Sequence, residues 1–218
     1  MSRPLPARIA AAATLSLMAA GIAGCARQGD ILEGGILTAY SACPPAAIPA
    51  PAGDITLFNP EGSRDAAAID VVGTISNVRS SCTEGSDRLV TSVSFDVYAL
   101  RRDNGAARQV VLPYFASVVQ GGQNVVAKRT GNVVLNFAPG QFRATTSTTA
   151  QSQVLRSAAT LPANIQQQIT ARRRAGDPNA ALDPLADPAV RQAVEAARFE
   201  LLVGFELTPD QLRYNATR

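Results

Sequence analysis

After residue 53, apolar and polar residues alternate with a period of two over most of the chain, which predicts half-buried β-strands. Segment 89–100 is the clearest case, because one face is apolar and the other mainly polar. The apolar face comprises Val93, Phe95, Val97 and Ala99, and the other face Ser92, Ser94, Asp96 and Tyr98. The same pattern predicts strands at 54–58, 69–78, 109–119, 125–126, 133–137, 142–153 and 199–207.

Turn residues separate these strands. Asp103-Asn104-Gly105 predicts a hairpin that pairs segment 89–100 with segment 109–119, since Asn and Gly tolerate positive φ. Gly121-Gly122 and Pro139-Gly140 predict the next two turns. Pro113 predicts a bulge or an edge position within its strand. The Thr- and Ser-rich segment 142–153 is typical of an exposed edge strand.

Two helices are expected before the last strand. Pro162 opens the first, and Arg172-Arg173-Arg174 end it. Asp187-Pro188 is an N-cap and N1 pair for the second, whose apolar stripe includes Val190 and Val194. After the last strand, Thr208-Pro209-Asp210-Gln211 has the spacing of a capping box.

Short antiparallel strands with a turn every 8–15 residues favour a β-sandwich. We therefore expect one mainly β domain over 54–218, similar in general shape to immunoglobulin and fibronectin domains, with a two-helix insertion at about 160–197 before the last strand. This similarity concerns architecture and implies no function.

The N-terminus has the features of an export signal. Arg3 and Arg8 precede an apolar segment, 9–23, that is shorter than the roughly 20 residues of a membrane span. The segment ends in Ile22-Ala23-Gly24-Cys25, which resembles the lipobox of bacterial lipoproteins. The resemblance implies removal of residues 1–24, a diacylglycerol and a further acyl chain on Cys25, and anchoring to a bacterial membrane. The alternative is an ordinary signal peptide followed by a chance cysteine.

Residues 25–53 would then connect the lipid to the domain. By analogy with lipoprotein sorting, Ala26 after the lipidated cysteine favours the outer membrane, with the protein facing the periplasm. Segment 26–42 is unusually apolar for a linker, so it either packs on the domain or contacts a partner or the membrane. Segment 44–51, rich in Pro and Ala, is expected to be extended.

Cys43 and Cys82 remain after the anchor. In an oxidising compartment, an even pair predicts a disulfide, and the alternatives are two free thiols or a metal pair. The chain has no histidine, so no Ser-His-Asp or Cys-His catalytic set can form and no third zinc ligand of that kind exists. We expect no metal site and no cofactor.

The formal net charge of +3 includes the two arginines of the signal segment and falls to about +1 without them, which argues against nucleic-acid binding. Two features are candidate partner contacts. Arg172, Arg173 and Arg174 form either a solvated helix end or a site for anionic headgroups or an acidic partner. Tyr98, Tyr114 and Phe115 form either an exposed aromatic patch or, as we favour, a set covered by the inserted helices.

These observations favour a non-catalytic, lipid-anchored envelope protein that binds other envelope proteins, such as an accessory subunit of an outer-membrane complex. One alternative is a periplasmic carrier or chaperone for an apolar ligand, which would require a cavity between the sheets or under the helices. Another is a carboxylate-based cell-wall hydrolase, which would require two facing acidic side chains in a cleft.

Overall fold

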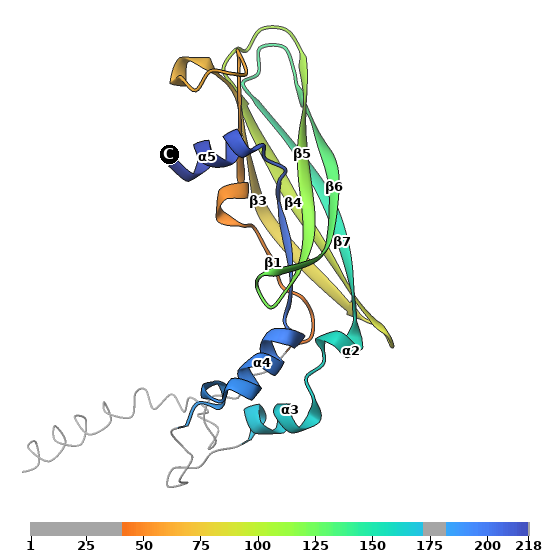
Figure 1. The fold of residues 1–218 in the computed structure, drawn as a ribbon. Coiled ribbons are helices and arrows are strands. Elements are labelled where there is room, and N and C mark those ends of the chain that lie inside the picture. Colours follow the sequence, from red (N-terminus) through yellow and green to blue (C-terminus); the bar gives the residue numbers. More distant parts are fainter. Residues whose placement is uncertain (1–40, 172–181, 218) are drawn as a thin grey trace, which may run out of the picture. The chain divides into compact units, whose positions relative to one another are not determined.

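The computed structural model describes residues 41–171 and 182–217. The predicted signal segment, the predicted lipidation site Cys25 and the cluster Arg172-Arg173-Arg174 lie outside these described residues. The described residues form a β-sandwich with helices before its last strand, which confirms the predicted fold class (Figure 1).

Each of the two sheets has four strands. Sheet I has the order β2-β3-β4-β7 and is antiparallel throughout. Its strands are β2 (Asp54–Phe58), β3 (Ile69–Glu84), β4 (Arg88–Arg101) and β7 (Arg143–Leu155). Sheet II has the order β1-β8-β5-β6 and is antiparallel except that β1 runs parallel to β8. Its strands are β1 (Ala46–Ala47), β8 (Phe199–Phe205), β5 (Arg108–Gln120) and β6 (Asn124–Phe137).

The main core lies between the two sheets, where the predicted apolar faces meet. The inward face of β4 is buried as predicted, whereas Tyr98 on its outer face is 49% exposed. β8 alternates in the same way, with its odd-numbered residues inside. The largest fully buried side chains are Phe95, Phe137, Phe205, Ile55, Leu89, Leu112, Leu135 and Leu201.

The predicted hairpin at Asp103-Asn104-Gly105 is wrong. β4 belongs to sheet I and β5 to sheet II, so this connection crosses between the sheets. Neither Asn104 nor Gly105 adopts the positive φ that a two-residue hairpin turn requires. Instead, a carboxylate oxygen of Asp103 accepts a hydrogen bond from the Gly105 amide at 2.9 Å. The true neighbours of β4 are β3 and β7.

The other turn and edge predictions fare better. Gly121 and Gly122 have φ of +61° and +77° and join β5 to β6, which do pair. Gly140, with φ of +74°, lies in the crossover from β6 to β7. Pro113 lies one residue beyond the ladder between β5 and β8, at a local edge, and the bulge in β5 lies farther on, at Val118/Val119. β7 is an edge strand of sheet I, as predicted.

The helices before β8 form a second, smaller core. α2 (Arg156–Ala159) and α3 (Ala163–Thr170) follow β7, and η4 (Pro184–Ala186) and α4 (Pro188–Ala197) precede β8. The side chain of Asp187 caps α4 by accepting from the amide of Ala189, as the Asp-Pro pair predicts. The buried residues of this second core are Leu161, Ile165, Val190 and Ala197.

A disulfide connects the start of the described chain to β3 of sheet I. Cys43 and Cys82 form the predicted disulfide, with their Cα atoms 6.1 Å apart.

After β8, α5 (Pro209–Thr217) begins with a reciprocal capping box. In it, the Thr208 amide donates to Gln211 Oε1 at 2.9 Å and the Gln211 amide donates to Thr208 Oγ1 at 3.2 Å. The short helices η2 (Ala50–Ala52) and η3 (Ala66–Ala68) flank β2.

Candidate functional site

The three aromatic residues singled out in the sequence do not form one patch. Tyr98 lies on the outer face of sheet I, whereas Tyr114 and Phe115 belong to sheet II. Tyr114 packs with the main core, and its ring meets the Phe95 ring edge-on at 5.5 Å. Phe115 projects to the other face, where the ammonium group of Lys128 lies 5.3 Å from its ring. The helices form a separate core and do not bring the three together.

Three of the four sheet edges carry features that prevent another strand from pairing with them. Unpaired edge strands invite such pairing, and proteins block it with short strands, charges, prolines or covering segments. β1 is two residues long. β2 is five residues long and is followed by Asn59-Pro60, and the side chain of Asn215 donates to its Asp54 carbonyl oxygen at 2.7 Å. β6 carries Lys128 and Arg129 in its exposed half.

β7 has none of these features. It is 13 residues long, and the residues from Ala144 to Leu155 include no charged residue and no proline. Its register with β4 runs from Arg143 to Leu155 without a shift, so no bulge interrupts the edge. In the described part of the chain, β7 is therefore the one long sheet edge without a protective device.

The hydrogen-bond pattern shows which β7 residues face outward. The Arg101 amide donates to the Phe142 carbonyl, and the Arg156 amide donates to the Asp87 carbonyl. Because the register does not shift, the even-numbered residues of β7 direct their backbone groups toward β4. The odd-numbered residues direct theirs to the free edge: Thr145, Ser147, Thr149, Gln151 and Gln153.

Side-chain hydrogen bonds also connect β7 to its neighbour β4. Ser147 Oγ donates to a carboxylate oxygen of Asp96 on β4 at 2.6 Å, and the Asn77 side chain donates to the other at 2.8 Å. These two hydrogen bonds, Ser147 first, hold the pKa of Asp96 below its usual value, so the carboxylate stays charged. β7 is thus hydrogen-bonded to β4 along one side, and its other side, toward β6, forms no backbone ladder among the described residues.

A cleft of about 280 Å³ opens between the sheets where β6 and β7 lie beside each other. Residues of β5 and β6 line one side of it, and residues of β4 and β7 line the other. The lining residues are Arg88, Ala116, Val118, Ala127, Arg129, Gln151, Ser152 and Gln153. This cleft contains two arginines and no carboxylate, so it does not present the facing acidic pair that a glycosidase would need.

Two buried hydroxyl groups lie side by side near this cleft, and that of Ser152 belongs to a lining residue. Thr91 on β4 and Ser152 on β7 are directly paired residues, 1% and 8% exposed. Neither hydroxyl has a hydrogen-bond partner among the described residues. Cys82 is the partner of Thr91 on its other side, so the disulfide and both hydroxyls lie in one row across sheet I.

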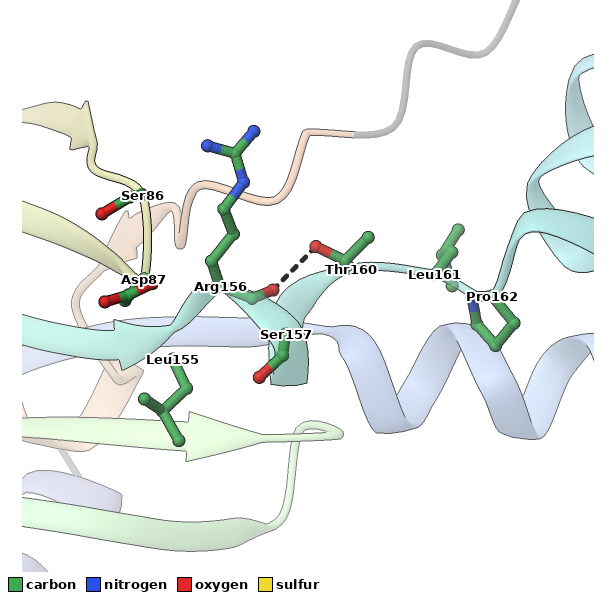
Figure 2. Close-up of a pocket in the computed structure, with 8 residues that line it drawn as sticks. All are labelled: Ser86, Asp87, Leu155, Arg156, Ser157, Thr160, Leu161 and Pro162. Atoms are coloured by element: carbon green, nitrogen blue, oxygen red, sulfur yellow. Dashed lines mark hydrogen bonds between the residues drawn. The ribbon is translucent and has the colours of Figure 1, made fainter.

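A shallow depression of about 550 Å³ lies where β7 ends (Figure 2). Figure 2 shows the Arg156 and Leu155 side chains projecting in opposite directions, with Thr160 donating to the Arg156 carbonyl oxygen at 2.7 Å. The Arg156 guanidinium binds the Gly85 carbonyl at 3.1 Å and lies 3.5 Å from the carboxylate of Glu84. These contacts assign Arg156 a structural role at the β3–β4 turn.

A further depression beside α5 contains Arg64, Asp210 and Arg213. Asp210 forms ion pairs with both arginines, so its carboxylate is neutralised. Within residues 41–171 and 182–217, no group of three His, Cys, Asp or Glu residues is placed to hold a metal ion. In the same part of the chain, no helix is long and apolar enough to cross a membrane.

No family model, curated protein or solved structure matches this chain. The candidate site therefore rests on its own geometry: the open edge of β7 and the adjacent cleft. One signal of it was visible in the sequence, namely the absence of charge between Arg143 and Arg156. A second was Thr91 on the apolar face of segment 89–100, whereas the cleft itself depends on how the two sheets pack.

Proposed function

We propose that this protein is a lipid-anchored, non-catalytic protein of the bacterial envelope that binds a partner protein by accepting an extended segment beside β7. The observation that carries the proposal is the long edge of β7 without charge, proline or bulge. Other proteins bind extended peptides in this way, with main-chain hydrogen bonds giving affinity and side-chain contacts giving selectivity.

The composition of β7 indicates the chemistry of the partner segment. The outward-facing residues carry hydroxyl and amide groups, and the nearest charge on this strand is at Arg143. From Thr145 to Thr149, away from the two arginines of the adjacent cleft, such an edge imposes no charge requirement on its partner, so an uncharged, β-branched segment fits it best. The protein would recognise its partner mainly through hydrogen bonds to the partner's backbone.

The lipobox and the disulfide support the anchored arrangement. About 18 residues separate Cys25 from Cys43, which limits the tether to at most about 60 Å. The disulfide holds Cys43 to β3, and Ala46 pairs with Leu201 near the start of β8. The tether therefore joins the sandwich at the end where Ser152 of β7 lies, in the same row as Cys82. A partner bound along β7 would be held near the bilayer.

The test uses two substitutions at Thr149, an outward-facing and exposed residue in the middle of β7. Thr149→Pro removes an amide that faces the free edge and leaves the ladder with β4 intact. Thr149→Val keeps that amide and the β-branched shape. Each protein is purified, lipidated, from gently solubilised membranes, and the co-purifying proteins are quantified.

We expect a stoichiometric partner with the wild type and Thr149→Val and its loss with Thr149→Pro. In the complex, hydrogen exchange at Thr145, Ser147 and Gln151 should slow, whereas the even-numbered amides should change little because β4 already protects them. Equal recovery with both variants would refute binding at β7. A Cys25→Ala variant tests the anchor separately, since it should release the protein from the membrane fraction.

A further inference from the structure

We propose that the cleft between β6 and β7 is a binding site for a small organic anion that bears a carboxylate or phosphate group. The site adjoins the edge of β7 that accepts a partner, and Gln151 and Gln153 belong to both. Its evidence is the charge of its lining, the direction of Arg129 and the two buried hydroxyls.

The lining is positively charged without compensation. Arg129 pairs with Ala116, whose side chain is buried between the sheets, so Arg129 lies on the inward face of β6, where it remains exposed. Arg88 also lines the cleft, reaching it from the outer face of sheet I, to which the even-numbered residues of β4 belong. In the described part of the chain, neither arginine forms a salt bridge. Guanidinium groups match the planar geometry of carboxylate and phosphate oxygens.

The buried hydroxyl of Ser152 supplies a donor at the wall of the same cleft. A buried hydroxyl without a partner is unfavourable, and a ligand oxygen in the cleft would satisfy it. The neighbouring Thr91 hydroxyl, on the adjacent strand β4, also has no hydrogen-bond partner among the described residues. The methyl groups of Ala116, Val118 and Ala127 leave room for a short apolar part of the ligand.

An inward-facing charge on an edge strand can also act only to prevent strand pairing. That role would explain Arg129 but not a second arginine and an unsatisfied serine at the same cleft. The two roles make different predictions for Ser152, because a purely protective charge has no use for its hydroxyl.

The test measures binding of sodium phosphate and of sodium succinate to the full-length protein by titration calorimetry and thermal unfolding, with sodium chloride at matched ionic strength as the reference. Arg129→Gln and Ser152→Ala alter the cleft. Arg143→Gln is the matched control, since Arg143 is an exposed arginine at the other end of β7 with no ion pair among the described residues.

We expect saturable binding of at least one of the two anions, weakened about tenfold or more by Arg129→Gln and by Ser152→Ala and unchanged in Arg143→Gln. Ser152→Ala should unfold at the same or a higher temperature, because it removes an unsatisfied buried group. Phosphate binding alone would assign a phosphate ligand, and succinate binding alone a carboxylate ligand.

Binding that is absent for both anions, equal to that of chloride, or unaffected by both cleft variants would overturn the proposal. The result is independent of the partner-binding test. Thr149→Pro should bind the anion normally, and Arg129→Gln should still retain the partner.

Discussion

Arg108, the first residue of β5, donates two hydrogen bonds to the carboxylate of Asp70, with N–O distances of 2.7 and 2.5 Å. Asp70 belongs to β3 of sheet I and Arg108 to sheet II, so the pair links the two sheets at the end opposite Cys82. The hydrogen bonds from Arg108 lower the pKa of Asp70, although partial burial acts in the opposite direction.

We expect Asp70→Asn to lower the free energy of unfolding at neutral pH by up to about 1 kcal/mol, because the Arg108 side chain is 42% exposed and water screens the pair. The pKa of Asp70 is lower in the folded than in the unfolded state. The pair therefore stabilises the protein fully above the unfolded pKa of about 3.9 and loses its effect as the pH falls through the lower folded value. Urea unfolding of both proteins between pH 3 and 7 measures this difference.

Asp87→Asn is the control, since Asp87 is an exposed carboxylate without an ion pair among the described residues. Its unfolding free energy should stay within about 0.5 kcal/mol of the wild type. If the difference between wild type and Asp70→Asn grew below pH 4, Asp70 would not be the group responsible.

Thr91→Val should stabilise the protein by about 1 kcal/mol, since valine has nearly the same shape and removes a buried hydroxyl without a partner. Thr74→Val on β3 is the comparison with opposite sign. The Thr74 hydroxyl donates to the Asp54 carboxylate at 2.6 Å, so its loss should destabilise. Denaturant midpoints of the two variants decide the matter, and a destabilised Thr91→Val would show that this hydroxyl has a partner in solution.

Reduction of the Cys43–Cys82 disulfide should lower the free energy of unfolding by about 4 kcal/mol, given the chain entropy of the loop that it closes. The effect should also be visible locally. The Leu201 amide donates to the Pro45 carbonyl at 2.9 Å, two residues after Cys43, so its hydrogen exchange should accelerate on reduction. The amides of β4 and β7 in the middle of sheet I should exchange as before, and equal acceleration there would indicate global unfolding instead.

The alternation of residues predicted most of the strands and their faces, but not the sheet to which each strand belongs. It missed β1, and it gave 125–126 and 133–137 as two strands where β6 runs unbroken over Asn124–Phe137. Turn residues show where the chain reverses, and they are the same whether the next strand pairs alongside or crosses to the other sheet. Arg101 marks the difference. It is 4% exposed, lies over the Phe137 ring and donates to the carbonyls of Gln141, Ala106 and Ala138, in both crossovers.

From the sequence pattern of segment 89–100, Arg101 would be expected to be an exposed residue just after the strand. Its role depends on two loops that are far apart in the chain and meet only in the folded state. The two parts of the candidate site also differ in how far they can be predicted from the sequence. The uncharged edge of β7 follows from local sequence, whereas the cleft requires Arg129 and Ser152 to come together from different sheets.

On the outer face of sheet II, Gly204 of β8 lies very close to Ala52 of η2 and to the Phe115 ring. A Cβ atom added to Gly204 of β8 would lie 2.7 Å from the Cβ of Ala52 in η2 and 3.0 Å from the Phe115 ring. The Ala52 Cβ is fixed to the backbone and cannot rotate away. Gly204→Ala should therefore destabilise the protein by about 1–3 kcal/mol. Adding Ala52→Gly should recover part of this loss, since it removes the closest atom, although the Phe115 contact remains. Thermal unfolding of the two single variants and the double variant gives the coupling directly. Additive effects would show that η2 can move away from β8 at little cost.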